Sequence, residues 1–201
     1  MGSIPNYRSL IFYFMTKIER AQAYAHKAHD SINQVRKYTG EPYWVHTDEV
    51  AAIVSSVVFS EDMVCAAHLH DVLEDVWPIL NGFNFSVIEQ DFGSHVAEMV
   101  LDLTDQYTKE ACPDLNRKKR KHLERLRIGL ITPASKTIKL ADLISNTKSI
   151  VEHDRDFANV YLREKWELLP YLENGSSILF EQARQAAIDG LTKLGLTDVI
   201  K

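Results

Sequence analysis

The sequence predicts an all-α fold, a single-domain multi-helix bundle, and three observations support this. Apolar residues recur at offsets 0, 3, 4 and 7, as in Val50, Ile53, Val54 and Val57, which is the spacing of one face of an α-helix. No stretch of comparable length alternates at the period of two that a half-buried strand requires. The breaks between the periodic stretches are short and rich in Pro, Gly and Asn, so none is long enough to be an interdomain linker.

The expected helices follow one another along the chain as apolar stripes. The stripes fall on residues 50–57, 65–73, 96–103, 123–130 and 179–191. The breaks fall at 39–42, 78–82, 112–114, 133 and 173–175. We therefore expect one domain over residues 1–201, with a C-terminal helix over about residues 176–192.

Two apolar segments do not fit this pattern. Leu10–Met15 is far shorter than the roughly 20 residues of a membrane span, and it lacks the features of a secretory signal, so we expect it to pack against the bundle. Trp77–Phe85 is too apolar for a solvated loop. It is open whether this second segment forms a lid, forms a subunit contact in a homodimer, or packs against its own bundle.

Composition narrows the classes of function. A chain of 201 residues with 45% hydrophobic residues can bury a core without disulfide bonds, which leaves any metal free for chemistry. A formal net charge of −5 argues against nucleic acid as a main partner, and no membrane association is expected. Cys65 and Cys112 lie in unrelated contexts without a CxxC spacing, which favours a reducing, cytoplasmic setting.

Candidate chemical groups lie in three places. The string 70–75 places His70 and Asp71 beside two further acids, Glu74 and Asp75, and so many anions repel one another unless a cation offsets them. Alone, this string would be read as a solvated acidic helix end. However, His46 stands at the start of the helix that carries the 50–57 stripe, and Asp142 interrupts an otherwise apolar helix. Together these residues form a set of two histidines and two aspartates.

The flanks of this set resemble the HD superfamily of metal phosphohydrolases, and in particular the hydrolase domain of RelA/SpoT-type alarmone enzymes and their small stand-alone relatives. The resemblance covers about residues 16–172. It rests on GEPYWVH at 40–46, AAHLHDVLED at 66–75, FGSHVAEMVLDLTD at 92–105 and KTIKLADLISNT at 136–147. It implies a helical fold, one Mn²⁺ and 3′-pyrophosphate hydrolysis of guanosine tetraphosphate-like nucleotides. The implied metal ligands are His46, His70, Asp71 and Asp142.

The residue types are compatible with this implication. Imidazole and carboxylate ligands suit Mn²⁺, Fe²⁺ or Zn²⁺, and the lack of thiolates argues against a closed structural zinc site. By analogy with the paired acids of the family, Glu74 and Asp75 are expected to orient and deprotonate the attacking water. The alternative is that these two acids support the ligand histidines from behind.

Several side chains are candidates for substrate binding. Arg36 and Lys37 precede the GEPYWVH turn, and Asn146 matches the asparagine of the family after its KLAD motif. Tyr161 and Lys165 share a helix face and are expected to close over a ribose. The basic run at 117–121 is read as a solvated face, with phosphate binding as the less favoured alternative.

The chain departs from the family pattern at Leu143, where many alarmone hydrolases have a basic residue, and at Thr147. These departures leave the metal ligands intact but keep the substrate open. A broader nucleotidase acting on ppApp, a dNTP or NADPH, and a catalytically silent nucleotide-binding module, remain alternatives. Because a synthetase part is not seen in the sequence, the chain is expected to degrade alarmones and not to make them.

Overall fold

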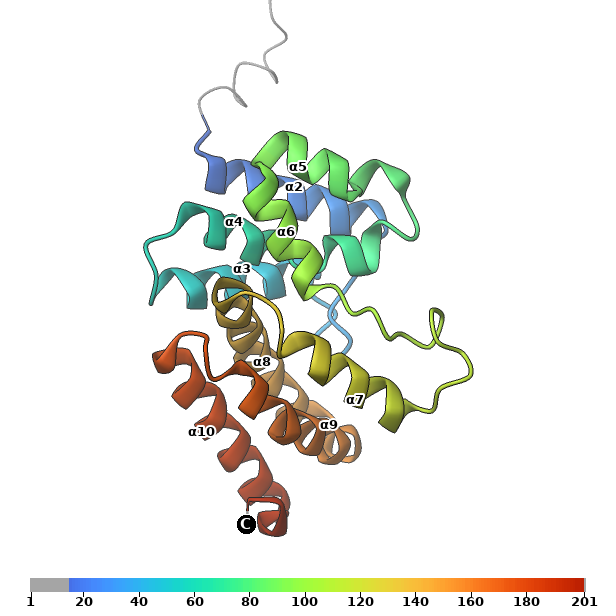
Figure 1. The fold of residues 1–201 in the computed structure, drawn as a ribbon, viewed down its shortest axis with the longest axis vertical. Helices are drawn as coiled ribbons and strands as arrows, with labels where there is room; N and C mark the ends of the chain where they lie inside the picture. The colour runs from blue at the N-terminus through green and yellow to red at the C-terminus, as the bar shows by residue number, and fades with distance from the viewer. Residues whose placement is uncertain (1–14, 201) are drawn as a thin grey trace, which may run out of the picture.

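The computed structural model describes residues 15–200, and within them the backbone is almost entirely helical (Figure 1). The α-helices are α2 (Lys17–Ser31), α3 (Trp44–Ser55), α4 (Glu61–Leu69), α5 (Phe85–Phe92), α6 (Ser94–Leu103), α7 (Arg117–Ile128), α8 (Pro133–His153), α9 (Arg155–Leu168) and α10 (Ser177–Leu194). A π-turn covers Val72–Val76, and 3₁₀ turns cover Asn81–Phe83, Leu169–Leu172 and Thr197–Val199. The predicted all-α fold is confirmed, and α10 matches the expected C-terminal helix.

Local signals in the sequence explain where the helices begin and end. Thr16 and Glu19 form a capping box at the start of α2, so both residues satisfy backbone N–H groups that a helix leaves free. Thr132 caps α8 and is followed by Pro133, whose missing N–H costs nothing in the first turn. Gly195 ends α10 at φ 76°, a left-handed conformation that favours glycine.

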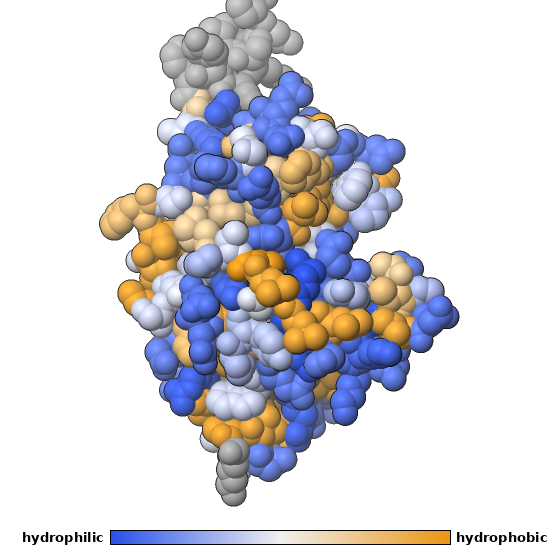
Figure 2. All heavy atoms as spheres, in the orientation of Figure 1, coloured by the Kyte–Doolittle hydropathy of each residue, from blue (hydrophilic) through white to orange (hydrophobic). Residues whose placement is uncertain are grey.

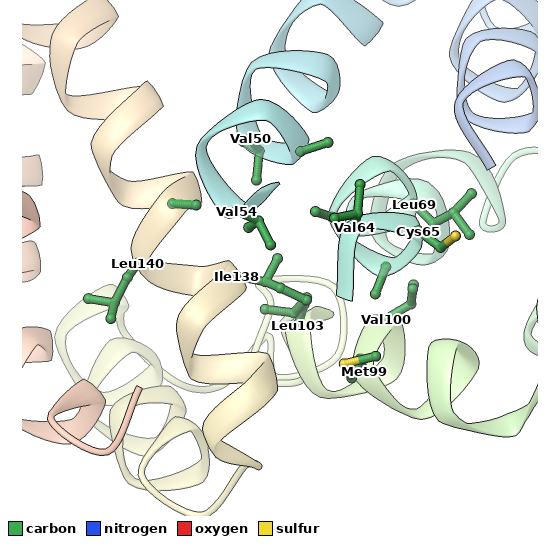
Figure 3. Close-up of a cluster of buried hydrophobic side chains, with 14 of the residues drawn as sticks. Val50, Val54, Val64, Cys65, Leu69, Met99, Val100, Leu103, Ile138 and Leu140 are labelled. Carbon is green, nitrogen blue, oxygen red and sulfur yellow. The ribbon is translucent and has the colours of Figure 1, made fainter. Parts of the chain in front are cut away.

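Helix α8 runs through the middle of the molecule. It contacts α3, α4 and α6, which carry the first half of the chain, and α9 and α10, which carry the last part (Figure 1). Figure 3 shows side chains from α3, α4, α6 and α8 meeting in one apolar cluster, among them Val50, Val54, Leu69, Val100 and Ile138. Burial of each such side chain contributes about 1.5–3 kcal/mol to the stability of the fold. The apolar cluster therefore holds α8 in place, and with it the polar residues further along this helix.

The acidic string after α4 is not part of one continuous helix. We expected an apolar helix over 65–73, but α4 ends at Leu69 and a π-turn replaces the next turn, with the Trp77 N–H bonded to the Val72 carbonyl at 3.0 Å. Val72 and Leu73 are buried in the core, whereas Glu74 and Asp75 are only partly covered. The wider turn therefore directs the two acids away from the core, and such π-turns often occur at functional sites.

The expected stripe on α7 is wrong. Leu126 and Leu130 are 45% and 89% exposed, and Figure 2 shows hydrophobic side chains at the surface over this part of the molecule. Glu124 and Ile128 are buried instead. The carboxylate of Glu124 accepts the backbone N–H groups of Gln106 and Tyr107, each at 3.0 Å, so α7 turns a polar residue inward to satisfy the preceding loop.

The apolar segment Trp77–Phe85 divides into two parts. Phe83 packs against the core and meets Tyr24 edge-on, with ring centroids 5.4 Å apart. Trp77 and Ile79 remain 42% and 65% exposed. The inner part therefore packs against the bundle, and a lid or a homodimer contact at Trp77 and Ile79 stays a prediction.

Three further expectations concern the chain as a whole. The predicted packing of Leu10–Met15 lies, apart from Met15, outside the described residues. Among residues 15–200, helices long and apolar enough to cross a membrane are absent. Cys65 and Cys112 are both free.

Candidate metal centre and adjoining cavity

Three parts of the fold bring two histidines and two aspartates together. His46 lies in the first turn of α3, His70 and Asp71 lie between α4 and the π-turn, and Asp142 lies on α8. The Nε2 atom of His46 is 3.7 Å from Asp71 Oδ2 and 3.3 Å from Asp142 Oδ1. The Nε2 atom of His70 is 3.0 Å and 3.9 Å from the same two oxygens. We call these four residues the metal cluster.

The metal cluster has the donor geometry of a cation site. One ligand atom each of His46, His70 and Asp142 lie within 4.8 Å of one another, and all three residues are buried. None of the contacts to the carboxylates has hydrogen-bond geometry, so both Nε2 atoms are buried without a hydrogen-bond partner among the described residues. A buried imidazole nitrogen without a hydrogen-bond partner is costly, and a divalent cation bound here would satisfy both nitrogens. The residues present therefore fit the metal that the sequence implies.

The outer atoms of the cluster are held by polar neighbours. The Tyr43 hydroxyl donates to Asp71 Oδ2 at 2.7 Å. The amide of Asn146 donates to Asp142 Oδ1 at 2.6 Å, and Lys139 Nζ lies 3.0 Å from Asp142 Oδ2. These contacts fix the directions of both carboxylates before any cation binds.

Charge is balanced within the cluster. Burial lowers the pKa of His70, but the carboxylates of Asp71 and Asp142 outweigh burial and raise that pKa to about 9. Burial raises the pKa of Asp142, but Lys139 and the imidazoles hold it well below its ordinary value. Both carboxylates are therefore ionised at neutral pH. A divalent cation that binds must displace the proton that His70 carries at neutral pH, so its affinity falls as the pH is lowered.

The two acids of the π-turn are held in different ways. Glu74 Oε2 accepts the backbone N–H of Asp105 at 2.9 Å, and Asp75 Oδ2 accepts the side-chain amide of Gln34 at 2.7 Å. Burial, followed by the charges of Asp105 and Asp71, raises the pKa of Glu74 to about 7. Burial and the charge of Asp71 raise the pKa of Asp75 to about 6. Both groups can exchange a proton near neutral pH, which general acid–base catalysis requires.

A cavity of about 310 Å³ adjoins the metal cluster at Asp142 and extends between α7, α8 and α9. Its volume is at the lower end of the range for small-molecule sites. Its wall is chemically mixed. Basic side chains come from α7, α8 and α9, and apolar side chains include Ile150, Phe157 and Leu168. This combination suits a ligand that has both an apolar ring and anionic groups.

Three of the five predicted substrate-binding residues line this cavity, namely Asn146, Tyr161 and Lys165. Arg36 and Lys37 are not part of its wall. Lys37 Nζ lies 3.0 Å from Asp154 Oδ2 at the surface. The structure thus does not bring these two basic residues into the cavity, and their role stays a prediction.

Lys165 is almost completely buried, at 2% exposure. Its Nζ donates to the Leu143 carbonyl at 2.7 Å and contacts the Thr147 hydroxyl, and burial lowers its pKa to about 7. Leu143 and Thr147 are the two positions where the chain departs from the family pattern. The structure therefore places a basic side chain from α9 beside both of these positions.

Other residues line the cavity besides these candidates. Sequence reasoning missed Lys139, and it favoured a solvated face for the basic run at 117–121, of which Arg117 and Lys121 line the cavity. A signal existed for Lys139, since it stands three residues before Asp142 and therefore on the same helix face. Which members of the basic run turn inward depends on how α7 packs, and that packing was not predictable from its misleading apolar stripe.

The sequence and the fold are similar to those of known proteins. Residues 21–166 match a family model described as HD domain. The chain is 31% identical over 137 residues to a GTP pyrophosphokinase of Myxococcus xanthus, a match that covers 66% of this chain and 17% of that protein. It is 31% identical over 111 residues to the guanosine-3′,5′-bis(diphosphate) 3′-pyrophosphohydrolase MESH1 of Drosophila melanogaster, covering 54% of this chain and 56% of that protein.

Two solved structures share the fold. One is described as a metazoan ortholog of SpoT that hydrolyzes ppGpp, with a TM-score of 0.73 and 23% identity, and the match covers 97% of this chain and 99% of that one. The other is lmo0812 from Listeria monocytogenes EGD-e, with a TM-score of 0.58 and 23% identity over 76% of this chain. The chain spans less than a fifth of the length of the pyrophosphokinases and about half the length of MESH1.

Proposed function

Because this chain belongs to the HD domain family, as the match over residues 21–166 shows, we propose that it is a metal-dependent hydrolase that removes the 3′-pyrophosphate of guanosine-3′,5′-bis(diphosphate), ppGpp. The observation that carries the proposal is the buried metal cluster beside a cavity that combines cations with apolar side chains. The activity named for MESH1 and for the SpoT ortholog supports the choice of substrate.

The metal is proposed to be Mn²⁺, held by His46, His70, Asp71 and Asp142. Two imidazoles and two carboxylates suit this ion, though Fe²⁺ and Zn²⁺ accept the same set. When bound, the cation supplies Lewis acidity toward water and toward phosphate oxygens. The protein contributes the fixed positions of the ligands, since Tyr43 holds Asp71 through the hydrogen bond described above.

Glu74 and Asp75 are proposed to handle the proton of the attacking water. Glu74 accepts that proton, because its raised pKa of about 7 gives a basic fraction near neutral pH together with affinity for the proton. Asp75 orients the water while the side-chain amide of Gln34 holds Oδ2 of Asp75. In the alternative role, as supports for the ligand histidines, the acids would affect metal affinity more than turnover.

Substrate recognition is proposed to lie in the cavity. Asn146 donates to Asp142 and lines the cavity, and its amide is proposed to contact the reacting phosphate. Tyr161 and Lys165 face the ribose or a phosphate further along, and Phe157 offers a ring face for the base. Lys139 and the basic residues of α7 add cations for the phosphates.

A substrate panel tests this proposal against its alternatives. Purified protein is incubated with ppGpp, ppApp, dNTPs and NADPH, with and without Mn²⁺, and pyrophosphate and orthophosphate are measured separately. We expect Mn²⁺-dependent release of pyrophosphate from ppGpp. Release of orthophosphate from the other nucleotides would identify a broader nucleotidase, and binding without turnover would identify a silent module. The setting is proposed to be the cytoplasm, where nucleotides are present and free thiols such as Cys65 and Cys112 persist.

A further inference from the structure

A chain of two hydrogen bonds reaches His46 from the side opposite its Nε2 atom. Ser145 Oγ lies 2.9 Å from His46 Nδ1, and the same hydroxyl donates to Glu49 Oε2 at 2.8 Å. His46 and Ser145 are buried, at 1% and 2% exposure. Glu49 lies one turn after His46 on α3, and Ser145 lies one turn after Asp142 on α8. The two hydrogen bonds therefore link the two helices that carry these cluster residues.

The direction of these hydrogen bonds decides the tautomer of His46. A carboxylate only accepts, and a serine hydroxyl has one proton to give. Because Ser145 gives its proton to Glu49, its oxygen must accept the second hydrogen bond, and His46 Nδ1 must carry the proton. The neutral imidazole then has its lone pair on Nε2, the atom that faces the metal cluster.

When His70 is neutral, it adopts the same tautomer for a different reason. Its Nδ1 lies 2.8 Å from the backbone carbonyl of Ala67, which can only accept. The tautomer of His70 is therefore set by the main chain, whereas the tautomer of His46 is set by two side chains. Of the two histidines, only His46 has a partner that substitution can remove.

We propose that Glu49 and Ser145 are positioning residues that hold His46 in the metal-ligating tautomer and raise its basicity as a ligand. This inference rests on the proposed metal site. Glu49 does not line the cavity, and its carboxylate accepts its hydrogen bond from Ser145 and not from a residue of the metal cluster, so a role in substrate binding is not needed to explain it. Partners of this kind behind a ligand histidine typically contribute 10- to 100-fold to metal affinity.

We call the two hydrogen bonds from Glu49 through Ser145 to His46 the relay. Three substitutions test its parts separately. Glu49→Ala removes the acceptor, so the Ser145 proton is free to turn toward His46 Nδ1 and permit the tautomer that blocks Nε2. Ser145→Ala removes the relay itself. Glu49→Gln keeps an oxygen that can accept from Ser145 but removes the charge. We expect Mn²⁺ affinity to fall by roughly 10- to 100-fold for the first two and by less for Glu49→Gln.

Calorimetric titration of the metal-free full chain with Mn²⁺ measures these affinities without reference to activity. Ser149→Ala and Glu152→Gln on α8 are matched controls, since they are the same residue types near the end of that helix. His46→Ala supplies the reference for loss of the ligand. Melting curves show whether each variant folds, and Glu49→Gln, the mildest change, keeps the test usable if Ser145→Ala does not.

The outcomes are distinguishable. If Glu49→Ala and Ser145→Ala bind Mn²⁺ as tightly as the two controls while His46→Ala binds weakly, the relay is refuted and the metal site stands. If His46→Ala itself binds Mn²⁺ like the unaltered protein, the proposed metal site is refuted. Nitrogen-15 NMR of the metal-free protein, at a pH where the imidazoles are neutral, gives an independent readout. The relay requires the His46 proton on Nδ1, and a proton on Nε2 would overturn it.

Discussion

The metal cluster and the α7–α9 wall of the cavity differ in whether their ligand-binding groups already have partners. In the cluster, the Nε2 atoms of both histidines have no hydrogen-bond partner among the described residues, although every ligand is held from behind. On the wall, the cations already have partners: Arg117 Nε lies 2.7 Å from Glu164, Lys121 lies 2.9 Å from Asp105, and Arg125 lies 2.8 Å from Glu167.

This difference indicates how each region would bind its ligand. The cluster is preorganised, so a cation gains contacts without displacing others except protons. On the wall, a phosphate must replace carboxylates that already pair with the cations. Such half-exposed ion pairs contribute only about 0–1 kcal/mol, so the exchange costs little and the net gain per cation is also small. We therefore expect large effects from changes in the cluster and small ones from changes on the wall.

The largest effect is expected for Asp71→Ala. Removal of this carboxylate takes away one anionic ligand and leaves His70 without its nearest counter-charge, so both metal and activity should be lost. Elemental analysis beside turnover measures both. An Asp71→Ala protein with a full metal content and a normal rate would refute the ligand assignment.

A smaller but still large effect is expected for Glu74→Ala. The variant should keep its metal and slow turnover by about 10²-fold or more, the usual scale for loss of a general base. Metal content and kcat are measured together, with Glu110→Ala in the loop before α7 as an exposed control. Loss of metal with an unchanged rate per bound ion would instead show that Glu74 supports the ligands.

On the wall, Arg117→Ala should raise KM for the nucleotide by about 10-fold or less and leave kcat nearly unchanged. The reason is that Arg117 exchanges one partner, Glu164, for another, and binding that is equal in ground and transition states appears in KM alone. Arg155→Ala at the exposed start of α9 is the control. If Arg117→Ala lowered kcat as much as Glu74→Ala does, the expectation of small effects on the wall would be wrong.

The smallest expected effect concerns stability and pH in the metal-free protein. The pKa of Glu74 is raised in the folded state, from 4.5 to about 7, so the folded state favours its neutral form. The stabilisation is complete below the ordinary pKa and is lost as the pH rises through about 7. Glu74→Gln removes this dependence, so its melting temperature relative to the unaltered protein should increase with pH over that window.

At this chain length, each kcal/mol of change in the free energy of unfolding shifts the melting temperature by about 2–4 °C. Thermal melting of the unaltered protein and of Glu74→Gln between pH 4.5 and about 7 measures the difference in melting temperature. Groups that titrate in both proteins cancel in this difference. A difference that stays constant with pH would show that Glu74 is not buried in the way described.

The sequence predicted the metal cluster far better than the cavity. His46, His70, Asp71 and Asp142 lie in local motifs on which the resemblance to the HD superfamily rests, and the structure brings all four side chains together. The cavity depends instead on how α7 and α9 pack, which local spacing does not encode. The apolar stripe on α7 gave the wrong buried face, because Glu124 turns inward to satisfy the loop before it.

The predicted fold shows the same division. Helix positions followed from apolar periodicity and from breaks such as Pro133, at which α8 begins, and both are local signals. The π-turn at Val72–Val76 was not predicted, since its sequence continues the apolar stripe of α4 without a break. Lys165 was selected as a substrate residue, but its contact with Leu143 and Thr147 became visible only when α8 and α9 were placed side by side.

The most direct test of the central claim is an anomalous-difference map from crystals of the full chain grown with Mn²⁺. The account predicts one strong peak within bonding distance of Nε2 of His46, Nε2 of His70 and one carboxylate oxygen each of Asp71 and Asp142. A map without a peak among these four residues at saturating Mn²⁺, or with its main peak elsewhere on the molecule, would contradict it.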